Sequence, residues 1–299
     1  MKVGLRMTLI HPLIKLLRPH QYIKNCFVLL GTLFAHQWSI LTLFDAAQAF
    51  IAFCFMASAV YVLNDIMDVE ADREHPIKRH RPLPKGQISM PLAKGLLGCL
   101  VVTSLLLSWL ISGWVILFVS IYFLMNILYS WRLKHVVILD VFIISAGFML
   151  RILAGTIGLG IAPSSWLLLC GLMVTLFLGF SKRRAELLML EAAGAPYNNL
   201  TRKVLDDYSP ALLEQLSAVT AACTIISYGL YTVSLQTIAL HGSDKLIYTL
   251  PFVMYGIFRY LFLLHHKAKG NDTAKDLLTD IHLLITALGW VIATLWILS

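Results

Sequence analysis

Long apolar stretches follow one another along nearly the whole of this 299-residue chain, and they restrict its fold more than any other feature. The chain is 59% hydrophobic and only 13% charged, with a mean hydropathy of +0.78. A transmembrane helix needs about 17 to 25 mainly apolar residues, so the pattern predicts an all-α, polytopic membrane protein. Nine spans can be placed, near residues 22–40, 46–63, 92–112, 114–131, 137–159, 163–181, 216–240, 246–264 and 280–298.

The first of these spans is the least regular. Its start at Lys24 is polar, and Gln37 interrupts its far end. Part of residues 21–40 is therefore a candidate to lie in the membrane interface rather than across the bilayer. No soluble domain, solenoid-type repeat or low-complexity segment is evident, so we expect one membrane-embedded domain that covers residues 1–299.

Lysine and arginine fall almost entirely on one side of the predicted membrane. With a cytoplasmic N-terminus, that side receives the basic N-terminal segment and the two long polar loops, 65–91 and 182–215, whereas the opposite side keeps only Lys245. This partition follows the positive-inside rule and accounts for most of the formal charge of +8, so no nucleic-acid partner is needed to explain it. We predict an integral protein of a bacterial inner (plasma) membrane, with its chemistry in the cytoplasmic loops.

Three aspartates mark the point where the second apolar span ends. If residues 64–72 are helical, steps of about 100° per residue place Asp65, Asp68 and Asp72 within an arc of roughly 60°. Like charges on one face repel, and a divalent cation removes that repulsion. Mg²⁺ typically takes one or two carboxylates, several waters and phosphate oxygens. The three aspartates are therefore the candidate magnesium ligands, and Asn64 is a candidate to orient a carboxylate or a metal-bound water.

A dense basic run follows the aspartates directly. It contains Arg73, His75, Lys78, Arg79, Arg81 and Lys85. Arginine can bind phosphate oxygens with two parallel hydrogen bonds, so the run suits a diphosphate beside a metal. The alternative is an ordinary acidic helix end followed by a basic membrane-flanking loop, because both are common. The asparagine, the third aspartate and the density of cations favour a metal-bound diphosphate at the membrane surface.

The fifth span carries a second group of polar residues, with Asp140 and Arg151 inside it and Tyr129 and Lys134 at its mouth. Ionisable side chains within a membrane are costly and by default face a bundle interior or a watery cavity. On a helix, Asp140 and Arg151 share one face about 16 Å apart, too far to pair with each other. A bound anion is a natural partner for Arg151. The alternative is that both residues make interhelical ion pairs that fix packing.

Lys182 and Arg183 end the sixth span and are more ambiguous. A basic helix end is expected there from topology alone. Glu186 follows Lys182 by four residues, so the two also suit an ordinary helix pair. We keep both basic residues as candidate ligands of a substrate phosphate.

Together these residues resemble the UbiA superfamily of intramembrane prenyltransferases, over nearly the whole chain. The pattern Asn64-Asp65-x-x-Asp68-x-x-x-Asp72 looks like the first signature of that superfamily. The continuation from Asp72 to Pro82 is most similar to its polyprenyl-phosphate phosphoribosyltransferase branch. Other stretches that point the same way are Leu17-Arg18-Pro19, Lys24-Asn25, Tyr129-Ser130, Leu133-Lys134, Asp140-Val141, Gly147-Phe148, Leu150-Arg151, Lys182-Arg183, Glu186-Leu187 and 255–260.

One departure from the superfamily pattern is informative. A second DxxxD is common after the fifth or sixth span, whereas here Asp140 is followed four residues later by Ile144. The second carboxylate cluster is therefore incomplete. This departure argues against the usual prenyl transfer to an aromatic or quinone-precursor acceptor and fits the phosphoribosyl branch.

The resemblance implies a UbiA-like helical bundle that transfers 5-phosphoribosyl from phosphoribosyl pyrophosphate to a polyprenyl phosphate, with Mg²⁺ as cofactor and diphosphate as leaving group. The implied partners are these two substrates and the lipid bilayer, and a homo-oligomer is compatible with them. The candidate catalytic residues are Asp65, Asp68, Asp72, Asp140 and Arg151. The candidate substrate-binding residues are Lys24, Asn64, Arg73, His75, Lys78, Arg79, Arg81, Tyr129, Lys134, Lys182 and Arg183.

Two other functions compete with this hypothesis. A UbiA-type prenyltransferase would use the same aspartates to bind a prenyl diphosphate and would transfer the prenyl group to an aromatic or quinone-precursor acceptor. A transporter of organic anions would use the basic cavity instead. Transporter sites usually lie at matched, Gly/Pro-interrupted helices near the membrane midplane, and the sequence shows no such matched pair.

Overall fold

The computed structural model describes residues 2–35, 38–74, 78–192, 205, 207–266 and 273–298. Within these residues the chain forms helices and no strand, which confirms the all-α prediction. In chain order, with 3₁₀ helices marked η, the helices are α1 (Lys2–Leu17), η1 (Pro19–Leu29), α2 (Leu30–Phe34), α3 (Ile40–Met67), α4 (Val69–Glu74), η2 (Lys78–His80), α5 (Met90–Trp109), α6 (Gly113–Trp131), η3 (Leu133–His135), α7 (Leu139–Ala154), η4 (Ile157–Leu159), α8 (Ser165–Ala192), α9 (Pro210–Val233), α10 (Leu235–His241), η6 (Lys245–Thr249), α11 (Leu250–His266), α12 (Thr273–Thr279) and α13 (Ile281–Leu298).

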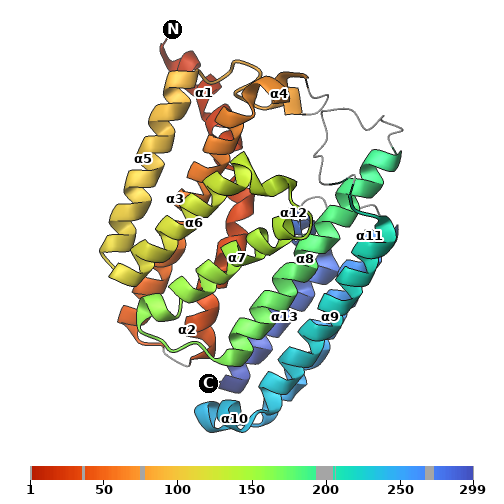
Figure 1. The fold of residues 1–299 in the computed structure, drawn as a ribbon. Helices are drawn as coiled ribbons and strands as arrows, with labels where there is room; N and C mark the ends of the chain where they lie inside the picture. Colours follow the sequence, from red (N-terminus) through yellow and green to blue (C-terminus); the bar gives the residue numbers. More distant parts are fainter. Residues whose placement is uncertain are drawn as a thin grey trace.

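Eight helical segments of the described chain are long and apolar enough to cross a membrane. They correspond to the second through ninth predicted spans, and they confirm a polytopic membrane protein. Figure 1 shows α3, α5 and α6 on one side of the bundle, α8, α9, α11 and α13 on the other, and α7 between the two groups.

The first predicted span, 22–40, is not a regular α-helix. Its described residues form η1 and the five-residue α2, which together run from the end of the bundle near α1 toward the opposite end (Figure 1). The expectation of a ninth regular span is therefore wrong for these residues. A 3₁₀ helix is more tightly wound than an α-helix, and here it lets the chain pass close to the neighbouring backbone.

Two glycines permit that close approach between η1, α2 and the end of α7. A Cβ atom added at Gly155 would lie 1.7 Å from the carbonyl oxygen of Val28. A Cβ atom at Gly31 would lie 2.2 Å from the carbonyl oxygen of Gly155. Since no side chain fits in either position, the contact depends on glycine at both.

The sixth span also differs from its prediction. α8 continues to Ala192, so the polar segment predicted to be a loop over 182–215 begins inside a helix. Residues 185–190, Ala-Glu-Leu-Leu-Met-Leu, are all strong helix formers, which explains the extension. Lys182 and Arg183 therefore lie on a rigid element rather than in a loop.

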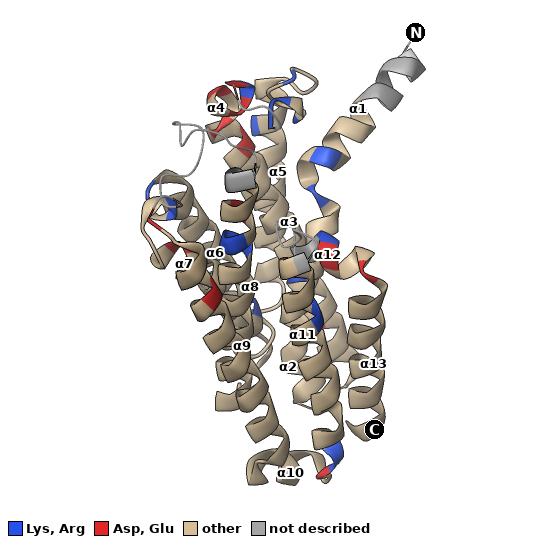
Figure 2. Cartoon of the chain, turned by 90° about the vertical axis from the view of Figure 1, so that its right-hand side faces the viewer, with Lys and Arg blue, Asp and Glu red and all other residues tan. Residues whose placement is uncertain are grey.

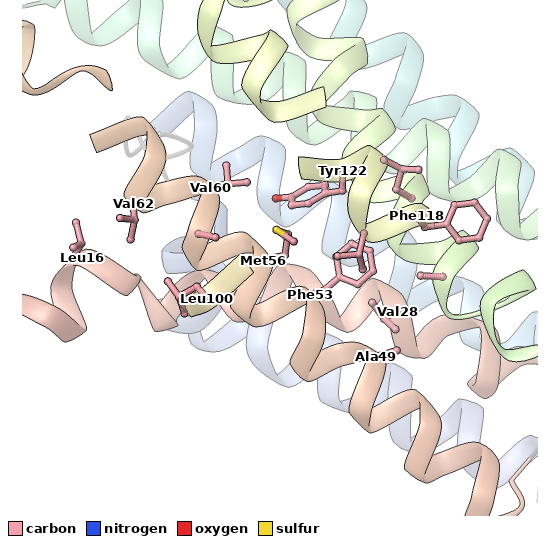
Figure 3. Close-up of a cluster of buried hydrophobic side chains, with 14 of the residues drawn as sticks. Leu16, Val28, Ala49, Phe53, Met56, Val60, Val62, Leu100, Phe118 and Tyr122 are labelled. Carbon is pink, nitrogen blue, oxygen red and sulfur yellow. The ribbon is translucent and has the colours of Figure 1, made fainter. Parts of the chain in front are cut away.

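A buried apolar cluster joins α1, η1, α3, α5 and α6 and holds the polar end of α3 in place (Figure 3). Helices within a membrane associate mainly through close van der Waals packing of such side chains, because lipid tails are as apolar as the side chains themselves. The cluster includes Leu16, Val28, Ala49, Phe53, Met56, Val60, Val62, Leu100, Phe118 and Tyr122.

Charged side chains are distributed unevenly along the bundle. Figure 2 shows that Lys, Arg, Asp and Glu gather toward the end that carries α4, whereas few lie near α10. We call the end that carries α4 the polar end. Its position agrees with the one-sided charge distribution seen in the sequence.

We predict that Gly155→Ala destabilises the protein, because the new methyl group would overlap the backbone at Val28. Overpacking of this kind typically costs about 1–3 kcal/mol. The midpoint of thermal unfolding in detergent should fall. Gly95→Ala on α5 is the matched control, since a Cβ there meets no atom within 4 Å. Equal midpoints for the two variants would contradict the close backbone contact.

Candidate active site

The three aspartates lie at the polar end, where α3 ends and α4 begins. α3 ends at Met67, and Asp68 follows with φ −94° and ψ 6°. Backbone hydrogen bonds continue across this point, from Asp68 N to Asn64 O at 2.9 Å and from Asp72 N to Asp68 O at 2.8 Å. The segment thus keeps the helical spacing on which the sequence prediction relied.

Asp65 and Asp72 are 1% and 2% exposed, and both bind Arg81. The Nη1 atom of Arg81 donates to Asp72 Oδ2 at 2.7 Å and to Asp65 Oδ1 at 3.1 Å. Arg18 also donates, from Nη2 to Asp65 Oδ1 at 2.6 Å. Buried carboxylates are costly unless they are paired, and here two guanidinium groups neutralise two carboxylates.

The position of the Arg81 nitrogen shows that these two carboxylates converge on one point that suits a cation. Carboxylate oxygens are also the ligands that Mg²⁺ prefers, at about 2.0–2.1 Å. Asp68 lies apart from the other two and pairs with Lys134, with Oδ1 and Nζ 3.5 Å apart. In the described part of the chain, no three Asp, Glu, His or Cys side chains converge as a metal site. The donor set at Asp65 and Asp72 fits Mg²⁺, and the predicted third carboxylate stands outside it.

The basic run after the aspartates divides between two environments. The Nζ atom of Lys78 lies 3.9 Å from Asp72 Oδ1, at the aspartate cluster. Arg73 instead donates to Glu70 at 2.8 Å on the surface, and 54% of its side chain is exposed. Of the predicted phosphate ligands in this run, Lys78 and Arg81 therefore face the aspartates.

Of the three remaining sequence candidates in these segments, two lie elsewhere. Arg79 is exposed at the polar end. Lys24 lines an apolar cavity inside the bundle. His75 lies outside the described residues.

A second polar cluster forms around Arg183, whose side chain is fully buried on α8. Its Nε donates to Asp140 Oδ2 at 2.6 Å, its Nη2 donates to the hydroxyl of Tyr129 at 3.0 Å, and its Nη1 pairs with Glu186. Lys182 lies 3.8 Å from Glu186 Oε1, as the helix pair expected from the sequence. Asp140 and Tyr129 therefore hold a cation in position, and for Asp140 this is the interhelical ion pair considered as the alternative.

Tyr208 completes this cluster, although no local sequence pattern selects it. Its hydroxyl donates to Asp140 Oδ1 at 2.9 Å and accepts from the backbone N–H of Ile138 at 2.6 Å. Ile138 has φ +67°, a left-handed conformation that is unusual for a β-branched residue and must be held by its surroundings. Burial and the neighbouring Asp140 carboxylate raise the pKa of Tyr208 above its usual range, so the hydroxyl keeps its proton.

The end of α6 connects the two clusters. Tyr129 belongs to the cluster around α8. The next residue, Ser130, donates from its hydroxyl to the side-chain oxygen of Asn64, beside the aspartates. Lys134, just beyond α6, pairs with Asp68. The two halves predicted separately from the sequence thus form one continuous polar site.

Arg151 has a different environment from the one expected of an anion ligand. It is 6% exposed, and its Nε donates to Asn25 Oδ1 at 2.7 Å while its Nη2 donates to the Tyr122 hydroxyl at 3.1 Å. Its guanidinium carbon also lies 4.6–5.5 Å from the ring centroids of Tyr122, Phe148 and Phe53. Within the described chain its hydrogen-bond partners are neutral groups. In the described residues Arg151 thus does not make the interhelical ion pair considered as the alternative, although its neutral hydrogen bonds do join α7 to η1 and α6.

An apolar cavity of about 290 Å³ lies among η1, α7, α8, α11 and α13. Phe27, Phe148 and Phe177 contribute to its wall, with Lys24 as a basic residue on the same wall. A cavity of this composition suits an apolar chain better than a sugar phosphate. The molecule thus offers an apolar binding volume within the bundle and a charged site at its polar end.

We predict that Tyr208→Phe destabilises the protein, because it leaves Asp140 Oδ1 and the Ile138 N–H without this shared partner. The loss of a buried hydrogen-bond partner typically costs about 1–3 kcal/mol. Thermal unfolding in detergent measures the effect. Tyr248→Phe is the matched control, since Tyr248 is 71% exposed. A Tyr208→Phe variant as stable as this control would mean that the hydroxyl does not hold the turn before α7.

The chain matches the UbiA prenyltransferase family over residues 25–284. It is 38% identical over 294 residues to a decaprenyl-phosphate phosphoribosyltransferase of Corynebacterium glutamicum, with 93% of this chain and 84% of that protein covered. It is 32% identical over 289 residues to a decaprenyl-phosphate phosphoribosyltransferase of Mycobacterium tuberculosis, with 95% and 93% covered.

The fold agrees with these sequence matches. The structure of a UbiA homolog from Archaeoglobus fulgidus bound to GPP and Mg²⁺ has a TM-score of 0.69 and 17% identity, and the match covers 96% of this chain and 99% of that one. The resemblance inferred from the sequence motifs is thus confirmed. The chain belongs to the UbiA prenyltransferase family.

Proposed function

We propose that this protein transfers the 5-phosphoribosyl group of phosphoribosyl pyrophosphate to a polyprenyl phosphate and releases diphosphate. The observation that carries the proposal is the buried cluster in which Asp65 and Asp72 converge on Arg81. Carboxylates for a metal and guanidinium groups for a phosphate lie together there. The relatives named as decaprenyl-phosphate phosphoribosyltransferases favour this reaction over prenyl transfer to an aromatic acceptor.

The reaction does not require the protein to act as a strong general base. The attacking group is an oxygen of the lipid phosphate, which is already an anion. Its bond to C1 of the ribose forms as the bond between C1 and the diphosphate oxygen breaks, and the electron pair leaves with diphosphate. Positive charge develops at C1 on the way. Alignment of the two substrates and stabilisation of charge are therefore the main requirements.

The aspartate cluster supplies the diphosphate site in this proposal. Asp65 and Asp72 would hold Mg²⁺, whereas Asp68 pairs with Lys134 and stands outside this pair. The metal, when bound, neutralises charge on the diphosphate leaving group. Arg81 contacts both carboxylates and Lys78 lies near Asp72, and these two are the residues we assign to the phosphate oxygens.

The lipid phosphate is assigned to the amines at the junction of the two clusters. Lys134 and Lys182 have side chains that are 20% and 33% exposed, so they are accessible to a substrate. Arg183 is fully buried and held by Asp140 and Glu186, so it shapes the electrostatic potential of the site. The apolar cavity beside Lys24 would take part of the polyprenyl chain.

We further propose that the polar end faces the cytoplasm of a bacterial inner membrane. Lysine and arginine concentrate at that end, as the positive-inside rule requires of a cytoplasmic face (Figure 2). Phosphoribosyl pyrophosphate is a soluble anion, and a basic surface of this kind attracts it.

The test uses purified protein in detergent with Mg²⁺, a polyprenyl phosphate and radiolabelled phosphoribosyl pyrophosphate. We expect label to enter the organic phase. Asp65→Asn should lower this transfer by roughly 100-fold or more, because the metal contributes several kcal/mol of charge stabilisation. Asp45→Asn, on the same helix but outside the site, is the control and should leave transfer unchanged.

Two results would contradict the proposal. If a prenyl diphosphate and an aromatic acceptor react while the sugar donor does not, the protein is a conventional prenyltransferase of the family. If Asp65→Asn transfers label as fast as Asp45→Asn, the aspartate cluster is not the diphosphate site.

A further inference from the structure

A second cavity, of about 260 Å³, opens at the polar end between α1 and the turn that follows η2. Lys15 comes from the end of α1, Arg18 and His20 from the start of η1, and Arg81 from the turn. Asp65 forms part of the wall. Polar and charged residues therefore predominate in its lining, whereas the cavity beside Lys24 is lined mainly by apolar residues.

The charges around this cavity do not balance. Three permanent cations, Lys15, Arg18 and Arg81, line the cavity with one carboxylate, Asp65, and Arg81 also pairs with Asp72 outside the lining. Both arginines already contact Asp65, at 2.6 and 3.1 Å. Lys15 instead donates to the backbone oxygen of His80 at 3.5 Å, a long contact with a neutral group. The excess positive charge favours an anion in the cavity.

The cavity also has a rigid basic wall. Arg18 separates α1 from η1 with φ 54° and ψ 57°, a left-handed conformation that costs energy for a residue other than glycine. Its guanidinium group lies 4.8 Å from the ring centroid of Tyr61 and is bonded to Asp65. The side chain is thus fixed from two directions, as a preorganised anion ligand requires.

We propose that this cavity binds the 5-phosphate of the sugar donor, an inference that rests on the proposed function. The donor carries a diphosphate at C1 and a monophosphate at C5, with the ribose between them. Asp65 belongs both to the aspartate cluster and to the wall of the cavity, so the two anion sites adjoin across one side chain.

This assignment also makes the cavity a determinant of donor specificity. A prenyl diphosphate has one anionic end and an apolar chain, so it has no group that would use the cations Lys15 and Arg18. A site that binds a second phosphate therefore favours binding of the sugar donor over binding of a prenyl diphosphate. Charge-assisted bonds to phosphate provide the discrimination.

Lys15→Met tests the proposal because Lys15 contacts neither the aspartates nor Arg81 in this structure. Binding of ribose 5-phosphate, and separately of pyrophosphate with Mg²⁺, is measured by calorimetry on the purified protein in detergent. We expect ribose 5-phosphate to bind about tenfold more weakly to the variant, the typical loss of one charge-assisted contact, with pyrophosphate binding unchanged. The KM for phosphoribosyl pyrophosphate should rise with kcat nearly constant. Lys94→Met, exposed on α5, is the control.

Arg18→Lys is a second variant, which keeps the positive charge but loses the fixed guanidinium geometry. It should also weaken the binding of ribose 5-phosphate. Equal binding of ribose 5-phosphate to wild type and both variants would overturn the proposal. A second result would also overturn the proposal. If inorganic phosphate binds wild type as tightly as ribose 5-phosphate does, and Lys15→Met leaves the KM for phosphoribosyl pyrophosphate unchanged, the cavity is a site for free phosphate.

The same experiment separates this inference from the function on which it rests. If wild type transfers label from phosphoribosyl pyrophosphate but Lys15→Met has an unchanged KM, only the 5-phosphate assignment fails. If wild type does not use this donor at all, the proposed function itself fails.

Discussion

The sharing of Arg81 between two buried carboxylates is the interaction on which the polar end of this bundle depends. Asp65 and Asp72 lie at the end of an apolar helix, where an unpaired carboxylate would cost several kcal/mol. Arg81 satisfies both of them, and Arg18 adds a second cation to Asp65. These contacts hold the start of η1 and the turn after η2 against α3. The same electrostatic requirement that organises the fold therefore also assembles a site for anions.

In the cluster around Arg183, a buried ion is again neutralised by side chains of opposite charge, but here the central ion is a cation. Here a guanidinium group, that of Arg183, is the fully buried ion, and Asp140 and Glu186 neutralise it. Tyr208 then fixes Asp140 from a segment that lies outside the helices. The end of α6 contacts both clusters, through Tyr129 and Ser130. Charged groups thus gather at one end of the molecule while an apolar cavity lies within the bundle, which is the arrangement that a substrate with a phosphate head and a lipid tail requires.

Local features of this structure were predictable from the sequence, and long-range ones were not. Hydropathy located eight of the spans, and helical periodicity brought Asp65 and Asp72 together but not Asp68, because both signals lie within a few turns. Arg18 and Asp65 form a hydrogen bond although 47 positions separate them in the sequence, and Tyr208 and Asp140 do so across 68 positions. No local pattern encodes such pairs. The charge of Arg151 alone suggested that it binds an anion. Its hydrogen-bond partner Asn25 lies 126 residues earlier, so no local pattern could reveal it. The irregular path of η1 likewise depends on a contact with Gly155 that only the folded chain reveals.

The pairing of Arg81 has a consequence for how the proposed substrates bind. Mg²⁺ alone would compete with a guanidinium group for the same carboxylates and would leave Arg81 without an anion. Diphosphate alone would approach two buried carboxylates of like charge. When the two arrive together, Asp65 and Asp72 can turn to the metal while Arg81 turns to the phosphate oxygens, and every buried charge keeps a partner of opposite sign. Metal and diphosphate should therefore bind cooperatively, each raising the affinity for the other by the same factor, because coupling between two binding sites is reciprocal.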